Sequence, residues 1–216
     1  MNWRVNQSTK RRQDRQGWML ISLFFIIAIP IAYFYVIVRS EFVARNPNTL
    51  CREDGVLTIE TVLLLDATDT FSESHRDSSL NYIEQFLVNS EQDEKFTLYS
   101  LNDDPGTFQP TLSICNPGDG KDLSEWTNNP ELAGKRWNED FFQIIVATVE
   151  SQMNIAPADN SPIMEMFKFV GIRSMFESTA PAKRIMVISD MVEHTSNYSQ
   201  YTQSVDFPTH KDSPYF

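Results

Sequence analysis

The sequence predicts an α/β domain carried behind a single membrane-spanning helix. Two observations predict this architecture. The first is an uncharged run of 21 residues near the N-terminus, from Trp18 to Val38. The second is the region after residue 55, where short apolar runs typical of buried strands alternate with segments of helical periodicity. Such alternation indicates a sandwich built on a largely parallel sheet.

The 216 residues divide into five predicted parts. A basic tail (1–17) precedes the membrane helix (18–38). A polar linker (39–54) leads to the exported domain (55–195), and a polar tail or a set of partial final elements (196–216) follows it. One ordinary domain with an appendage suits this length.

The apolar run is long enough to cross a membrane as a helix. At about 1.5 Å per residue, its length matches a hydrocarbon core of roughly 30 Å. Residues 1–17 hold five basic residues and one acid, so the positive-inside rule keeps the N-terminus in the cytoplasm. A cleaved signal peptide is the alternative, but the run exceeds a signal core and no small-x-small cleavage site follows it. We therefore expect an uncleaved anchor in the inner (cell) membrane, with the domain in the periplasm or outside the cell.

The predicted exported part is strongly acidic. The whole chain carries 18 Lys and Arg against 29 Asp and Glu. Residues 1–40 hold six of the basic residues and one acid, which leaves 12 basic and 28 acidic residues and a net charge of −16. A nucleic-acid binder needs a basic face to displace counterions from phosphates, so this class is excluded. The composition suits cations or basic protein patches, and a plain solvated acidic surface explains it equally well.

The two cysteines, Cys51 and Cys115, both lie in the exported part. An oxidising compartment would allow them to pair, and the bridge would pin the segment that leaves the membrane onto the domain. Two unrelated buried thiols are the alternative. The sequence leaves both open, because it gives no distance between the two residues.

The secondary structure is expected in the following order. Apolar runs predict strands that end at Val62–Leu65 and that cover residues 96–101, 111–115 and 184–189. Residues 67–77 are small and polar, which indicates a loop. Helical spacing predicts helices that begin at Ser78 or Ser79, that cover 131–153, and that cover 161–176 with Ser161 as the capping residue.

Three polar segments should meet at the carboxyl ends of the parallel strands, where ligands bind in sheets of this type. Asp66, Thr68 and Thr70 follow the first strand, Ser161 stands at a helix start, and Ser189 and Asp190 follow the last strand. Oxygen donors of this kind suit a hard cation, so we expect Asp66, Thr68, Thr70, Ser161 and Asp190 to bind Mg²⁺ or Mn²⁺. Simple loop capping by the two aspartates is the alternative reading.

This pattern resembles the von Willebrand factor A domain family and its metal-ion-dependent adhesion site. The family's Asp-x-Ser-x-Ser motif is matched by Asp66, Thr68 and Thr70, its loop threonine by Ser161, and its later strand-end aspartate by Asp190. The resemblance implies a three-layer, Rossmann-like sandwich. The family has further strand and helix units where about 25 residues follow here. Three explanations stay open: the sheet is truncated, the chain is a fragment, or a partner completes the sheet. An exposed edge of the last strand would be a place for another chain to pair.

The expected function is that of a membrane-anchored, A-domain-like binding module and not of an enzyme. Through Mg²⁺ it would engage an Asp or Glu of a protein partner, as a scaffold or assembly subunit of a larger membrane complex. Two alternatives stay open. One is a metal-dependent hydrolase similar to haloacid dehalogenase-like phosphatases, with Asp66 as nucleophile, although Thr68 stands where that family has a second aspartate. The other is a structural subunit whose metal site is vestigial.

Overall fold

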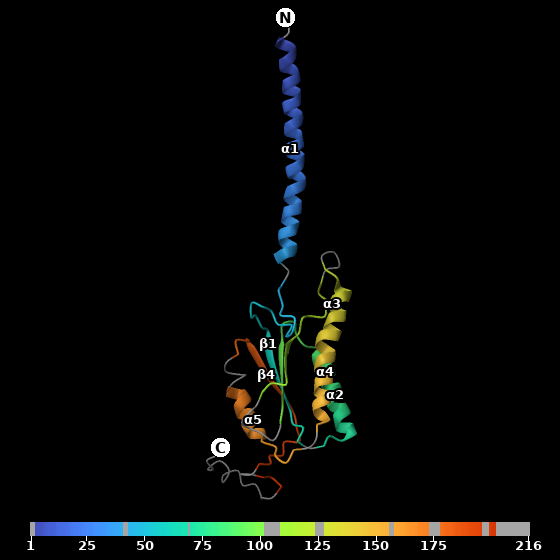
Figure 1. Ribbon diagram of the computed structural model, residues 1–216, viewed down its shortest axis with the longest axis vertical. Helices are drawn as coiled ribbons and strands as arrows, with labels where there is room; N and C mark the ends of the chain where they lie inside the picture. The colour runs from blue at the N-terminus through green and yellow to red at the C-terminus, as the bar shows by residue number, and fades with distance from the viewer. Residues whose placement is uncertain are drawn as a thin grey trace. The chain divides into compact units, whose positions relative to one another are not determined.

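The chain forms two compact units, Met1–Val43 and Ala44–Phe216, in the computed structural model (Figure 1). The structure describes residues 3–40, 43–68, 70–101, 109–123, 128–155, 158–172, 178–195 and 199–201.

The first unit is one long helix, α1 (Trp3–Ser40). Its stretch Gly17–Val36 is long and apolar enough to cross a membrane. Pro30 lies inside this stretch, where membrane helices tolerate proline better than soluble helices do. The predicted N-terminal apolar helix is therefore confirmed, and by length and composition it suits a membrane anchor or a signal sequence.

The second unit is built on a four-stranded sheet in the order β3-β2-β1-β4. Its strands are β1 (Ile59–Leu65), β2 (Lys95–Ser100), β3 (Leu112–Cys115) and β4 (Ala182–Ile188). Strand β1 runs parallel to both β2 and β4. All seven residues of β1 are buried, as expected of a central strand with both faces covered. The predicted α/β fold with a mostly parallel sheet is confirmed at this level.

Strand β3 departs from the parallel arrangement, because it pairs with β2 antiparallel. A parallel return needs a crossover of about a dozen residues or more, usually with a helix. The 11 residues between Ser100 and Leu112 fall short of that length. The short connection therefore explains the direction of β3.

Strand β4 forms one edge of the four-stranded sheet. Its first four residues, Ala182 to Ile185, are exposed. An edge strand of this kind carries unpaired backbone groups that another strand can use. The open edge of the last strand is thus present among the described strands, and its use by another chain stays a prediction.

Helices cover both faces of the sheet. Strand β1 shows why, since Leu63 and Leu65 face one apolar cluster while Val62 and Leu64 face another. The first cluster is completed from α2 (Glu73–Val88), the π-helical turn η2 (Trp137–Phe142) and α4 (Gln143–Met153), by Ile83, Leu87, Phe141, Ile145, Val149 and Met153. The second is completed from α5 (Ile163–Val170), by Ile163, Met166 and Val170. Figure 1 shows α2 and α4 on one side of the sheet and α5 on the other.

The single helix predicted over 131–153 is three successive segments. These are α3 (Pro130–Arg136), η2 and α4. The wider π turn, with its i to i+5 spacing, lets two consecutive phenylalanines meet one tryptophan. The ring centroid of Trp137 lies 5.8 Å from that of Phe141 and 5.4 Å from that of Phe142. Aromatic packing thus accounts for the irregular turn.

The start of α2 was predicted wrongly. The helix begins at Glu73, inside the expected loop 67–77, because Ser72 is its cap and accepts from the His75 amide at 3.3 Å. The first helical turns carry polar side chains that do not enter the core, so hydrophobic spacing appears only from Leu80 onward. The cap, and not the apolar pattern, decides where this helix begins.

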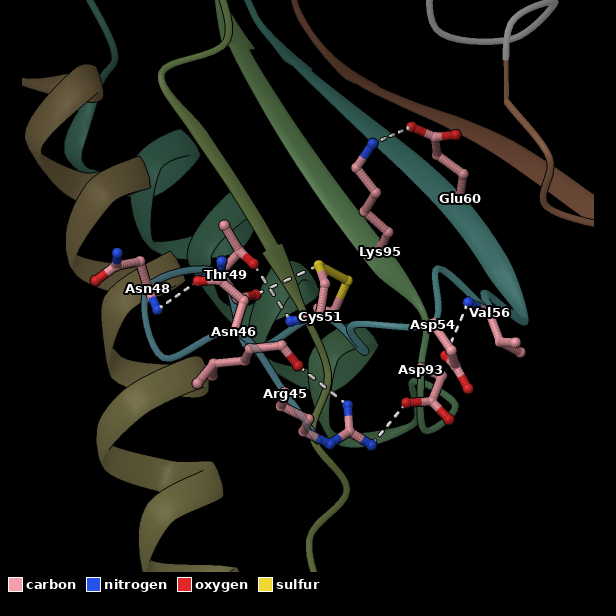
Figure 2. Close-up of a disulfide and its surroundings, with 12 residues drawn as sticks. Arg45, Asn46, Asn48, Thr49, Cys51, Asp54, Val56, Glu60, Asp93 and Lys95 are labelled. Atoms are coloured by element: carbon pink, nitrogen blue, oxygen red, sulfur yellow. Dashed lines mark hydrogen bonds and ion pairs between the residues drawn. A yellow bond between two sulfur atoms is a disulfide. The ribbon is translucent and has the colours of Figure 1, made fainter. Parts of the chain in front are cut away.

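Residues 44–54 are not a free linker but a clasp folded against the domain. Cys51 is joined to Cys115 by a disulfide, the pairing that the sequence left open (Figure 2). The Arg45 Nη2 atom lies 2.6 Å from the Asp93 Oδ1 atom. The clasp therefore belongs to the second unit, which begins at Ala44.

A second ion pair lies within the clasp itself. Arg52 donates to Asp54 through two guanidinium nitrogens, at 2.9 and 2.6 Å. This hydrogen bond, assisted by the one donated from the Val56 amide, lowers the pKa of Asp54 from 3.8 to about 2. The pair thus gives the clasp a carboxylate that stays ionised well into the acid range.

Candidate functional site

The candidate site lies where the parallel strands β1 and β4 end side by side. Their register pairs Leu65 with Ile188, so the next residues along the chain, Asp66 and Ser189, leave the sheet together. The backbone amide of Asp66 donates to the Ile188 carbonyl at 2.9 Å. Strand pairing therefore fixes these two residues at one edge of the sheet, as the sequence predicts for its strand-end polar groups.

The Asp66 carboxylate collects hydroxyl groups from three separate segments. Its Oδ1 atom accepts from the Thr68 hydroxyl at 2.6 Å and from the Thr68 amide at 3.2 Å. Its Oδ2 atom accepts from the Ser189 hydroxyl at 2.7 Å and from the Ser161 hydroxyl at 3.1 Å. Asp66, Thr68 and Ser161 are each at least 94% buried. A single buried carboxylate is thus the centre of the site.

Local turn chemistry accounts for only part of this arrangement. An aspartate that accepts from the amide two residues on is an ordinary turn, which explains the two bonds from Thr68. Ser161 and Ser189, however, stand 95 and 123 residues away in the sequence. Their convergence on the same oxygen is a property of the fold, so loop capping alone does not explain the site.

A cavity of about 480 Å³ opens beside Asp66. Apolar side chains contribute to its walls along with hydroxyls, an imidazole and two carboxylates. Its lining residues are Asp66, Thr70, Phe71, His75, Ser78, Ser79, Ile188, Ser189 and Asp190. The site therefore has room for a ligand directly against the buried carboxylate.

The five residues predicted as metal ligands fall into two groups. Asp66, Thr68 and Ser161 are brought together by direct hydrogen bonds. Thr70 and Asp190 line the adjoining cavity. Asp190 is exposed, and its Oδ1 atom accepts from the Val192 amide at 2.9 Å. All five thus border one site, with Asp190 on its open side.

Ser189 is a member of the site that the ligand prediction omitted. The sequence favours the aspartate beside it because a carboxylate is the stronger cation ligand. The signal that identifies Ser189 is the register of β4 on β1, since side chains on a strand alternate between the two faces. Ser189 lies on the same face as Asp66, and the register of β4 on β1 that places it there cannot be read from the sequence alone.

The donor set fits a hard cation by its chemistry. It consists of carboxylate and hydroxyl oxygens, which Mg²⁺ and Mn²⁺ prefer over softer metals. Within the part of the chain that the structure describes, no three His, Cys, Asp or Glu side chains gather to hold a metal. Of the histidines, His75 lines the cavity, His194 bonds to Ser199, and His210 lies outside the described residues. A cation here would rest chiefly on hydroxyl oxygens and water.

No protein-family model matches this chain, and no curated protein matches its sequence. Function is therefore inferred from the fold and from the geometry around Asp66.

Proposed function

We propose that this protein is a membrane-anchored binding module that resembles a von Willebrand factor A domain. In this proposal Asp66, Thr68, Thr70, Ser161 and Asp190 hold Mg²⁺, and the bound cation engages an Asp or Glu side chain of a protein partner. The observation that carries the proposal is the convergence of Thr68, Ser161 and Ser189 hydroxyls on one buried carboxylate beside an open cavity.

Hydroxyl groups suit this role because each is both a donor and an acceptor. The hydrogens of Ser161 and Ser189 now point to Asp66, while the oxygen lone pairs remain for a second interaction. A cation bound at these oxygens supplies positive charge that the residues themselves lack. Such charge is required for an acidic partner, because the region after residue 40 carries a net charge of −16 and would otherwise repel it.

The location in the cell follows from the first unit and the clasp. An N-terminal apolar helix and a disulfide in the following domain are typical of a membrane-anchored or secreted protein. The basic flank before the helix orients the domain to the periplasm or the cell exterior. A single-pass scaffold or assembly subunit of a membrane complex, without enzymatic activity, fits this arrangement.

One observation favours a second candidate, a structural subunit with a vestigial metal site. Asp66 accepts four hydrogen bonds from chain groups, so the carboxylate is satisfied without a cation. In this candidate the network would simply tie three loops together. The two candidates differ in one measurable property, the binding of a divalent cation.

A titration of the full-length chain in detergent micelles with Mg²⁺ and Mn²⁺, followed by calorimetry, tests the proposal. We expect saturable binding that is lost in Asp66→Asn and retained in Asp54→Asn. The latter removes a carboxylate from the clasp, at the other end of β1. A folded wild type that binds neither ion, or an Asp66→Asn variant that binds as the wild type does, would reject the metal-dependent mechanism.

A further inference from the structure

We propose that Glu193 is a positioning residue that caps α5 and thereby holds the Ser161 hydroxyl against Asp66. The consequence for cation binding rests on the proposed function. The positioning itself rests only on contacts within the domain and can be tested without a metal.

The first step is that helix α5 has no capping side chain at its own N-terminus. Ser161 stands one residue before the cap position, and its hydroxyl is directed at Asp66, to which it donates at 3.1 Å. The residue at the cap position is Pro162, which makes no side-chain cap bond. Helix termini leave amide groups without partners inside the helix, and capping side chains usually reach the second or third amide. The start of α5 therefore needs an acceptor from elsewhere.

The second step is that Glu193 supplies this acceptor. Its Oε2 atom accepts from the amide of Met164, the second residue of α5, at 2.9 Å. Glu193 is only 7% exposed, and a carboxylate at a helix N-terminus also interacts favourably with the helix dipole. A residue 29 positions beyond Met164 thus supplies the cap that α5 lacks at its own N-terminus.

The third step is that the neighbouring backbone holds Ser161 from both sides. The Ser161 amide donates to the His194 carbonyl at 2.6 Å, and the His194 amide donates to the Ser161 carbonyl at 3.1 Å. Glu193 is itself fixed by Gln200, which accepts from its amide at 2.9 Å and donates to its carbonyl at 3.0 Å. The segments at 161–164 and 193–194 are therefore joined by two backbone hydrogen bonds and by the bond from the Met164 amide to the Glu193 carboxylate.

Through these contacts Glu193 can influence the site although it does not line the cavity. Glu193 is not among the residues that line the cavity, so it acts through Ser161. Loss of the cap would make the first turn of α5 more mobile. The Ser161 hydroxyl would then no longer be held in one orientation toward Asp66. Partners one step removed from a metal ligand typically change metal affinity by 10- to 100-fold.

Two substitutions separate the reach of the side chain from its charge. Glu193→Gln keeps an acceptor oxygen at the same distance but removes the charge. Glu193→Asp keeps the charge but is one methylene too short to reach the Met164 amide. We expect Glu193→Gln to behave like the wild type, and Glu193→Asp and Glu193→Ala to show the defect.

The first measurement is amide hydrogen exchange of the metal-free, full-length chain in detergent micelles. In Glu193→Asp and Glu193→Ala, exchange at residues 158–164 should be about fivefold faster, which corresponds to loss of one typical cap. Unchanged exchange in both variants would overturn the positioning role. A second outcome would also overturn it. If residues 158–164 exchange as fast in Glu193→Gln as in Glu193→Ala, while Glu193→Asp exchanges like the wild type, then the charge of Glu193 and not its reach slows the exchange.

The second measurement is Mn²⁺ binding, followed by calorimetry and by water proton relaxation. Glu193→Asp and Ser161→Ala should each weaken binding about tenfold and let an additional water reach the ion. The double variant should be no weaker than either single variant, since both changes remove the same ligand. Additive losses would overturn the coupling of Glu193 to Ser161. A wild type that binds no Mn²⁺ would reject the proposed function, and hydrogen exchange would still decide the positioning role.

Discussion

The disulfide between Cys51 and Cys115 should supply a large share of the stability of the domain. The perturbation is the double substitution Cys51→Ser/Cys115→Ser, which removes the bond and keeps two side chains of similar size. The two cysteines stand 64 residues apart in the sequence. The bond therefore closes a long loop in the unfolded chain, where a cross-link has its main effect.

The magnitude follows from the entropy of closing that loop. For a loop of about 64 residues, the chain-entropy relation gives about 14 cal/mol/K, or about 4 kcal/mol at 25 °C. A typical domain is stable by about 5–15 kcal/mol, so the variant should lie near the limit of folding.

The assay is urea unfolding of the full-length chain in detergent micelles, followed by tryptophan fluorescence. We expect the free energy of unfolding to fall by about 4 kcal/mol in the double variant. Reductant should lower the wild type to the same value and leave the variant unchanged, which makes it the matched control. A fall of less than about 1 kcal/mol, or a wild type indifferent to reductant, would refute the loop-closure reasoning.

Three further predictions concern the core, the clasp and the start of α2. Phe141→Ala empties a fully buried site beside Trp137 and should cost about 3–5 kcal/mol in urea unfolding; a cost near zero would show that the site collapses. Because the pKa of Asp54 is lowered from 3.8 to about 2 by Arg52, its stabilisation is present above pH 3.8 and is lost as the pH falls toward 2. Thermal unfolding of Asp54→Asn should therefore change less with pH over that interval than unfolding of the wild type, and equal slopes would contradict the pair. Ser72→Ala removes the cap of α2 and should cost about 1 kcal/mol, whereas an unchanged urea midpoint would place the start of this helix elsewhere.

The central strand β1 was predictable because burial on both faces favours an apolar run in the sequence. Residues 62–65 of β1 are uniformly apolar, and β4 contains a similar run, so both could be located from composition alone. Asp66 and Asp190 then follow from the rule that ligands gather at carboxyl ends of parallel strands. This part of the fold depends on local patterns, which a single sequence contains.

The features that sequence patterns missed depend on contacts between distant residues. The Ser189 hydroxyl reaches Asp66 only because β4 pairs with β1 in one register. The local sequence predicts Ser161 as a helix cap, but Pro162 occupies the cap position and the Ser161 hydroxyl donates to Asp66, 95 positions away. The clasp shows no hydrophobic periodicity because no apolar stripe attaches it to the domain. A disulfide and an Arg45–Asp93 ion pair attach it instead.

The disulfide also determines which pieces a protease could release. Residues 51–115 form a covalent ring that contains β1, α2, β2 and β3. A single cut within residues 52–114 would leave every fragment attached to the rest of the chain. A single cut between Cys115 and Ser161 would remove the covalent connection of Ser161 and Ser189 to Asp66, which stays with the N-terminal helix. Shedding of an intact domain from the anchor therefore requires cleavage before Cys51, within the few residues that precede the ring.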